Sequence, residues 1–460
     1  MKRALPMLAA ALTGCVSAGP RAPAPLAAAV EPPAGWRTAS AGASAIRREP
    51  VRADWWTAFG DPALTALIAR ALANNVDIAV AAARIEEARA AEALARAQLS
   101  PQVGGTLPET QGQTLSPFGT PSRAIGAQPT LSASYDLDLF GRLRLANQAA
   151  RAQLLAASGA ADVVRLATAT STASGYITLR ALDQRLAIAR DTLSARADAL
   201  RIARRRFETG YSSRLELRQA QAEYAATQQL VPAAQLAIAR QENALSILAG
   251  DAPGSIARGV PIDRLALPPI PEGLPADLLR RRPDLFQAEQ ALVAADRLLD
   301  SQRAAFLPNL SLTGSAGLVL STALSNPVGV FALGASILAP LFDGGRLAAQ
   351  EDAATARRDQ AAFAYRRAAL IAFREVDDAL AGVRRTGEQA GALAGQEAAS
   401  RGALQNATNR YRAGYSAYIE QLDAQRTLLT AELSLVQARN DQLTSYVALY
   451  GAMGGGWQPR

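Results

Sequence analysis

The side chains that most enzymes use for catalysis are nearly missing from this sequence. The 460 residues include no histidine, one cysteine, Cys15, and one lysine, Lys2. A histidine-based triad, a zinc site with histidine or cysteine ligands, a cysteine nucleophile and a Schiff-base lysine therefore have almost no candidates. Asp and Glu are plentiful, but no pair of them lies in a loop that would suit a hydrolase. The sequence predicts a protein that is not an enzyme and that has neither a metal site nor a cofactor.

The single cysteine lies where a bacterial lipoprotein would carry it. The chain starts Met1-Lys2-Arg3, a short apolar run follows over residues 4–12, and Leu12-Thr13-Gly14-Cys15 comes next. This order is typical of a secretory signal, and the run is too short for the roughly 20 residues that span a bilayer. The four residues ending at Cys15 resemble a lipobox, which implies cleavage before Cys15 and acylation of that cysteine. By resemblance to lipoprotein sorting, Val16 in the next position, in place of Asp, favours transfer to the outer membrane over retention in the inner membrane.

The positive charge does not indicate a nucleic-acid binder. The formal net charge is +8 and comes almost entirely from arginine. The arginines are scattered among helical positions together with many Asp and Glu residues, and the densest cluster is Arg204, Arg205 and Arg206. Three adjacent cations are too few to follow a phosphate backbone. We therefore expect solvated helix faces and no nucleic-acid partner.

The sequence contains an internal repeat with a period of about 200 residues. Arg206-Phe207-Glu208-Thr209-Gly210-Tyr211 recurs as Arg410-Tyr411-Arg412-Ala413-Gly414-Tyr415, and shorter matches occur around it in the same order. A tandem duplication predicts that the two halves share one layout. The predicted division is a signal peptide at 1–14, a lipid-anchored tether at 15–53, a first repeat at 54–250, a Pro-rich linker at 251–273, a second repeat at 274–451 and a C-terminal tail at 452–460.

Helical and strand patterns follow each other in the same order in each half. The expected helices are 61–99, 141–208 and 213–249 in the first half, and one ending near 305, one at 343–411 and one after 414 in the second. Period-two alternation predicts strands near 103–107, 130–139, 309–314 and 331–337. Gly210 and Gly414 are expected to cap the long helices. Gly344-Gly345 is expected to form a strand-to-helix turn.

The lengths of these elements favour a mostly helical fold with a transmembrane β part. A helix of 68 residues is about 100 Å long, far longer than a compact domain. The strands approach the roughly 9–11 residues that cross a bilayer with tilt. Four strands per chain are too few to close a barrel, and open edges cannot face lipid. The strands therefore require oligomerisation if they span a membrane.

A resemblance to a known family rests on several of these motifs. Trp55-Trp56-Thr57-Ala58-Phe59-Gly60-Asp61-Pro62-Ala63-Leu64, the Arg410–Gln425 run, the repeat and the lipobox are similar to the TolC-like outer-membrane efflux family. Within it, they resemble the NodT-like lipoproteins of tripartite systems. The resemblance implies a homotrimer with a 12-stranded barrel and a helical periplasmic tunnel. It also implies contact with outer-membrane lipid and a passive role beside a periplasmic adaptor and an inner-membrane pump of the resistance-nodulation-division (RND) type.

The same resemblance implies two sets of functional residues. The turns where family members contact the adaptor correspond to Arg206, Phe207, Gly210, Tyr211, Arg410, Tyr411, Gly414 and Tyr415. The pore constriction beyond these turns corresponds to Glu216, Ile419, Glu420 and Asp423. A ring of carboxylates would attract cations there. The alternative for the first set is helix capping and hairpin packing alone, and for the carboxylates a solvated helix face. Gln219, the first-half counterpart of Asp423, is uncharged, which departs from a symmetric acidic ring.

Two other functions share parts of this pattern. A lipid-anchored coiled-coil scaffold of the envelope would show the same heptads and lipobox, but it would not need alternating strand segments at equivalent places in both halves. An outer-membrane duct for protein (type I) secretion would keep the fold and change the cargo. The lipobox and the Trp55-Trp56 motif favour small-molecule efflux over protein secretion by analogy, and fold alone does not fix the cargo.

Overall fold

The computed structural model describes residues 24–37, 51–115, 117–270 and 275–458. Cys15 and the predicted signal peptide lie outside the described residues, as does most of the predicted tether. The chain divides into two compact units. One comprises Met1–Val30, Arg84–Ser158 and Gln287–Arg367, and the other comprises Glu31–Ala83, Gly159–Phe286 and Ala368–Arg460. Each unit takes segments from both halves of the chain, so the boundaries between units do not follow the predicted repeat boundaries.

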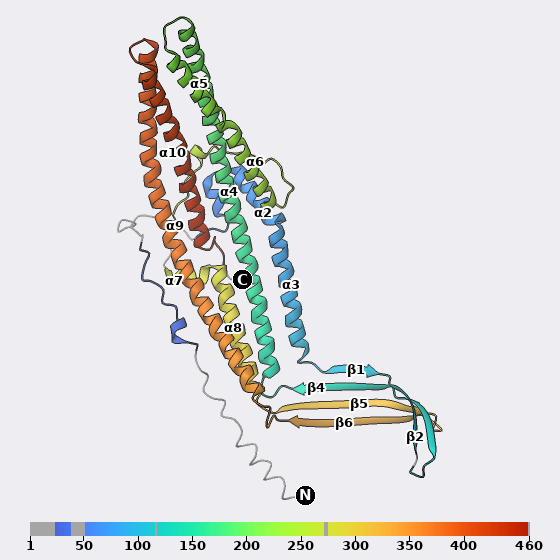
Figure 1. The fold of residues 1–460 in the computed structure, drawn as a ribbon. Coiled ribbons are helices and arrows are strands. Elements are labelled where there is room, and N and C mark those ends of the chain that lie inside the picture. Colours follow the sequence, from blue (N-terminus) through green and yellow to red (C-terminus); the bar gives the residue numbers. More distant parts are fainter. Residues whose placement is uncertain (1–23, 38–50, 116, 271–274, 459–460) are drawn as a thin grey trace. The chain divides into compact units, whose positions relative to one another are not determined.

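Helices make up most of the described residues (Figure 1), and their order is similar in the two halves. In the first half they are α2 (Pro62–Asn74), α3 (Val76–Ala97), α4 (Arg142–Glu208), α5 (Arg214–Gln228) and α6 (Leu230–Leu248). In the second half they are α7 (Pro275–Arg281), α8 (Pro283–Ala304), α9 (Arg346–Arg412) and α10 (Tyr418–Ala452). Short 3-10 turns occur at Leu26–Ala28, Trp55–Phe59 and Ile262–Arg264. The two long helices, α4 and α9, each contain 67 residues.

Two helices expected to be continuous are each broken once. The stretch 61–99 is interrupted at Asn75, whose side-chain oxygen accepts hydrogen bonds from the backbone N–H groups of Asp77 and Ile78 at 2.9 and 3.2 Å. The amide nitrogen of Asn75 donates to the Leu248 carbonyl at 3.0 Å. Asn75 is therefore the N-cap of α3. The stretch 213–249 is interrupted at Gln229, the residue between α5 and α6.

Within the part of the chain that the structure describes, six antiparallel strands form the sheet, where four were expected. They are β1 (Gln102–Thr106), β2 (Glu109–Leu115), β3 (Pro121–Ala127), β4 (Thr130–Leu137), β5 (Asn309–Ser321) and β6 (Val328–Leu338). The predicted count is wrong because Pro108 separates β1 from β2, and Pro129 lies between β3 and β4. Proline has no N–H to donate to a strand ladder. The first half thus contributes one long hairpin divided into four short strands, and the second half contributes one unbroken hairpin.

The register of the sheet gives it one apolar face and one polar face. Tyr135 of β4 pairs with Leu312 of β5, which pairs with Ala335 of β6. One residue further along, Ser134 pairs with Thr313. Because neighbouring residues of a strand point to opposite faces, the alternation expected from the sequence holds across all three strands. The sheet is therefore amphipathic.

The Trp55–Leu64 motif builds a buried corner of the second unit. The Trp55 ring stacks on Tyr450 with 5.5 Å between centroids. Asp61 caps α2 by accepting from the Ala63 N–H at 2.8 Å, and its other oxygen accepts from the Tyr176 hydroxyl at 2.8 Å and from the Val260 N–H at 2.9 Å. Burial raises the pKa of Tyr176 to about 12. The motif thus holds the start of α2 against α4, α10 and the Pro-rich segment.

Candidate functional site

Both long helices end in a left-handed glycine. Gly210 has φ 77° and Gly414 has φ 80°. After α4, the Tyr211 N–H donates to the Arg206 carbonyl at 2.8 Å, and after α9 the Tyr415 N–H donates to the Arg410 carbonyl at 2.9 Å. This is the Schellman pattern, which needs positive φ and therefore favours glycine. The expectation that both glycines cap long helices is confirmed.

The two turns lie next to each other at one end of the second unit (Figure 1). The tyrosine after each glycine is strongly exposed: Tyr211 is 88% exposed and Tyr415 is 81% exposed. No atom lies within 4 Å of the position where a Cβ on Gly210 or Gly414 would be. The turns therefore present two aromatic side chains and open space around both glycines.

Tyr411 behaves differently from the other predicted tip residues, because it is buried. Its side chain is 4% exposed, and its hydroxyl donates a short hydrogen bond to the carboxylate of Glu216 on α5. The Arg206 guanidinium lies 4.3 Å above the Tyr411 ring and donates to the Tyr411 carbonyl at 3.3 Å. The ring of Tyr418 is 5.6 Å away. These contacts connect the α4–α5 hairpin to the α9–α10 hairpin.

The environment keeps the Tyr411 hydroxyl protonated. Burial raises the pKa of Tyr411, and the hydrogen bond to Glu216 raises it further, while Arg206 opposes the shift. A neutral phenol is a hydrogen-bond donor. The contact with Glu216 is therefore present across the physiological pH range.

The predicted tip and constriction residues thus separate into two groups. Contacts between the two hairpins bring together Arg206, Tyr411 and Glu216. Glu216 was expected in the constriction, and Arg206 and Tyr411 were expected at an adaptor surface. Phe207 is half-buried. Arg410 and Glu420 form an exposed ion pair at 3.8 Å. The residues that stay accessible at the tips are Gly210, Tyr211, Arg410, Gly414 and Tyr415.

The first two turns of α10 have two faces with different character. Tyr418 and Leu422 are buried in an apolar cluster with Ala199, Ala203, Ala220 and Tyr411. Ile419 is 51% exposed, and Glu420 and Asp423 are also exposed. One face therefore packs on the other hairpin, and the other carries the three residues of α10 expected at the constriction.

A buried polar group near these residues was not anticipated. Arg196 of α4 is 2% exposed and lies 3.3 Å from the Glu223 carboxylate of α5. Ala189, Arg196 and Ala203 follow each other at intervals of seven, and all three are buried. A charged residue within a heptad stripe of small apolar residues was the signal that could have revealed it.

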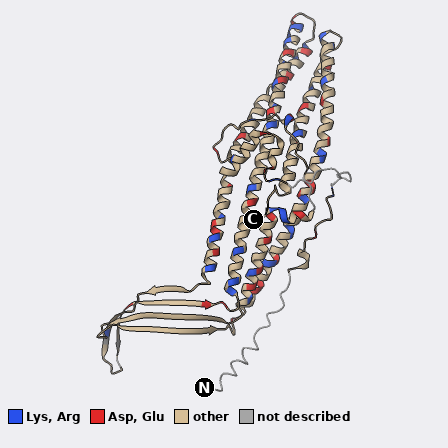
Figure 2. Cartoon of the chain, turned by 180° about the vertical axis from the view of Figure 1, so that it is seen from behind, with Lys and Arg blue, Asp and Glu red and all other residues tan. Residues whose placement is uncertain are grey.

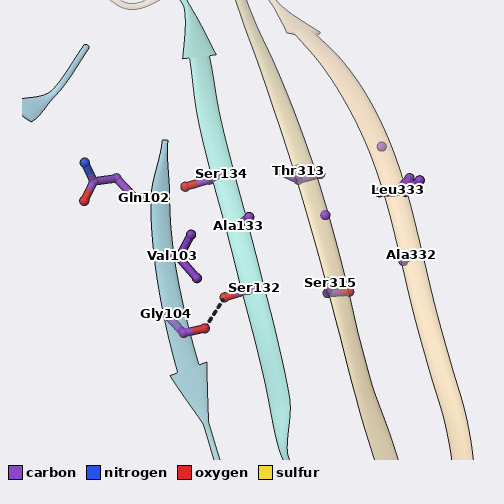
Figure 3. A pocket seen from close by; sticks show the side chains of 12 residues that line it. Gln102, Val103, Gly104, Ser132, Ala133, Ser134, Thr313, Ser315, Ala332 and Leu333 are labelled. Atoms are coloured by element: carbon purple, nitrogen blue, oxygen red, sulfur yellow. Dashed lines mark hydrogen bonds between the residues drawn. The ribbon is translucent and has the colours of Figure 1, made fainter. Parts of the chain in front are cut away.

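The apolar face of the sheet carries large exposed side chains. Phe331, Leu333 and Ile337 of β6 are 82%, 85% and 71% exposed. β5 and β6 carry no charged residue, and Figure 2 shows charges along the helices and few on the strands. A shallow hollow of about 460 Å³ over β1, β4, β5 and β6 is lined mostly by small residues, and Gly104, Ser132 and Ala332 among them share the polar face (Figure 3). Large exposed apolar faces mark protein or membrane contacts.

The comparison with protein families decides the identity. The model of the outer membrane efflux protein family matches the chain at residues 67–251 and 274–455. The chain belongs to this family. It is 34% identical to the probable efflux pump outer membrane protein TtgC of Pseudomonas putida, over 88% of this chain and 85% of the relative. It is 32% identical to the pyoverdine export outer membrane protein OpmQ of Pseudomonas aeruginosa, over 95% and 94%.

Solved structures agree with the family assignment. The outer-membrane channel OprN matches with a TM-score of 0.86 and 28% identity, covering 96% of this chain and all of that one. The chain is thus an outer-membrane component of an efflux system that extends into the periplasm, as the resemblance implied. Its relatives are named as transport components. These findings favour efflux over both the scaffold and the protein-secretion duct.

Proposed function

We propose that the protein is a passive homotrimeric duct that carries small organic molecules, drugs among them, across the outer membrane. The observation that carries this proposal is the amphipathic sheet with open edges. Within the described residues, β1 pairs with β4 alone and β6 pairs with β5 alone. Unpaired edges cannot face lipid, so sister chains must complete the ladder. Three copies of β1, β4, β5 and β6 supply the 12 strands of the expected barrel.

Acylation of Cys15 gives the duct a second attachment to the outer membrane. The lipobox-like Leu12–Cys15 segment supports this proposal. One acyl chain anchors a protein only marginally, whereas several chains anchor it firmly. Radiolabelled palmitate is expected to label the wild-type chain and not Cys15→Ser. Equal labelling of both chains would refute the lipid anchor.

The exposed turns serve as the contact with a periplasmic adaptor, and an RND-type inner-membrane pump supplies the energy. Tyr211 and Tyr415 are the residues best placed for this contact, because amphipathic aromatic side chains are enriched at interfaces. Gly210 and Gly414 permit the turn and leave room for a partner. Arg410 adds a cation beside the second turn.

The exposed face of α10 forms the constriction. In a trimer, three copies of Asp423, Glu420 and Ile419 would surround the axis and give a carboxylate ring next to an apolar ring. Such rings favour cations and restrict other solutes. Glu216 has a different role in this proposal, because its carboxylate already accepts the Tyr411 hydroxyl. It helps to hold the two hairpins together.

Deletion of the chain followed by a drug-susceptibility panel tests the proposed function. We expect the deletion strain to become more susceptible to several small organic compounds, and the wild-type chain to restore resistance. A Gly414→Leu chain, produced at the same level, serves as a matched control for expression without docking. An unchanged panel together with the loss of a secreted protein would instead establish a protein-secretion duct.

A further inference from the structure

A small pocket opens between three helices of the second unit. It has a volume of about 250 Å³. It is lined by Leu182, Arg185 and Ala189 of α4, by Leu230 and three alanines of α6, and by Leu429 and Leu433 of α10. The lining includes none of the residues assigned above to the adaptor contact or to the constriction. The pocket is therefore a separate feature of the helical part of the chain.

The sequence of α6 explains why space remains between these helices. Pro232 has no N–H to donate, and its ring would clash with the Gln228 carbonyl if one straight helix ran through this region. The helix is accordingly interrupted at Gln229, between α5 and α6. Just beyond the break, α6 contributes its three alanines to the pocket. Their side chains end at Cβ, so they leave open a space that packed helices normally fill.

Arg185 is the only charged residue in the lining, and every other lining residue is leucine or alanine. Its side chain is partly buried, yet none of the residues that the structure describes forms an ion pair or hydrogen bond with its guanidinium. Two other buried arginines of α4 do have carboxylate partners: Arg180 lies 2.6 Å from Asp183, and Arg196 lies 3.3 Å from Glu223. Because arginines that leave water are normally paired, Arg185 lacks the anion that its surroundings call for.

These walls suit one class of small molecule. The planar guanidinium of arginine matches the two oxygens of a carboxylate, whereas the leucines and alanines offer only apolar contacts. Ligand pockets commonly combine apolar walls with a few polar groups that orient the ligand. An apolar cavity of about 150 Å³ binds benzene, so the volume of about 250 Å³ has room for one ring with short substituents. A cation would be repelled by Arg185.

We propose that this pocket binds small apolar carboxylates, with the carboxylate held by Arg185 and the apolar part enclosed by α6 and α10. The site is built by a single chain and does not depend on the duct function proposed above. A bound carboxylate contacts three helices at once, so it stabilises the folded chain as its concentration rises above Kd.

Isothermal titration calorimetry of the purified full-length protein in lipid nanodiscs tests the site. The probes are 4-methylbenzoate and 4-methylbenzamide, which are similar in shape and differ in charge. We expect the benzamide to bind about tenfold more weakly than the benzoate, which is the smallest loss expected when a hydrogen bond between charged groups is replaced. Acetate has the carboxylate without the ring, and we expect no measurable binding of acetate.

Two pairs of variants separate the cation from the walls. Arg185→Gln removes the guanidinium, and Arg190→Gln is its control, because Arg190 is an exposed residue of α4 outside the lining. Ala234→Leu fills the pocket without a change of charge, and Ala239→Leu is its control at an exposed position of α6 outside the lining. We expect Arg185→Gln to weaken 4-methylbenzoate binding about tenfold and Ala234→Leu to abolish it. Both controls should bind like the wild type.

Three results would overturn the proposal. They are equal binding of 4-methylbenzoate by Arg185→Gln and Arg190→Gln, equal affinity of the wild type for the benzoate and the benzamide, and no binding by the wild type, as when a sister chain covers the pocket. If Ala234→Leu does not fold, the Arg185→Gln pair still decides the question. The drug-susceptibility panel tests the duct function separately, so either proposal can fail while the other stands.

Discussion

Replacement of Tyr411 by Phe removes one hydroxyl from the contact between the two hairpins. The Tyr411 side chain is 4% exposed, and its hydroxyl donates to the Glu216 carboxylate. The Phe ring keeps the tilted ring contact with Tyr418 and the contact with the Arg206 guanidinium. The substitution therefore tests a single hydrogen bond between the α4–α5 and α9–α10 hairpins.

The expected energy follows from the kind of bond that is lost. A hydrogen bond to a charged group contributes about 1.5–3 kcal/mol. Glu216 is only partly buried, so water can replace the lost donor, and the lower end of the range applies. A loss of about 1.5 kcal/mol changes an equilibrium roughly tenfold. If the bond exists only in the narrow state of the channel, the ratio of open to narrow states rises by that factor.

Bilayer conductance of Tyr411→Phe measures this ratio directly. Tyr415→Phe is the matched control, because it removes a hydroxyl from a tyrosine that is 81% exposed. We expect a clear rise in open fraction for Tyr411→Phe and none for Tyr415→Phe. Equal conductance of the two variants would show that the Tyr411–Glu216 bond does not distinguish the two states.

Three further results are expected. Gly210→Leu and Gly414→Leu each place a side chain at positive φ, which costs about 1–2 kcal/mol. Because no atom crowds either position, size-exclusion chromatography should still detect trimers of both variants. Drug export should nevertheless be lost. Normal resistance in both variants would refute the docking role. Asp423→Ala should raise single-channel conductance by removing a carboxylate ring, and an unchanged value would exclude Asp423 from the constriction. The pKa of Tyr411 is raised in the folded state by burial and by Glu216, so the stabilisation it provides is complete below the ordinary value of 10.0 and decreases only as pH rises above it. The ion conductance of the narrow channel should therefore be constant between about pH 6 and pH 9. A rise within that window would contradict the hydrogen bond between Tyr411 and Glu216.

Much of the fold could be predicted from local sequence signals. The absence of proline between 142 and 208 allowed α4 to be predicted almost to the residue, and the glycines that end α4 and α9 were recognisable as caps. Alternation of apolar and polar residues located β4 and β6. These features depend on neighbours in sequence, so the pattern alone specifies them.

The remaining features depend on contacts between distant residues. Helical periodicity showed no break at Asn75, because the hydrogen bond that holds Asn75 at the break is made to Leu248, far away in the sequence. Tyr411 resembled an exposed turn residue, but its partner Glu216 lies on the other hairpin. The Arg196–Glu223 pair joins two helices in the same way. Pairings of this kind are decided by how helices pack, which a single sequence does not display.

The hairpin β2–β3 differs from the rest of the sheet in its side-chain pattern. Glu109, Gln111 and Gln113 alternate with Thr110 and Gly112 along β2, so neither face of this strand is apolar before Leu115. The apolar alternation seen in β5 and β6 is therefore not continued in β2, beyond Pro108. Substitutions among the polar residues of β2 are therefore expected to leave the apolar face of β4, β5 and β6 intact.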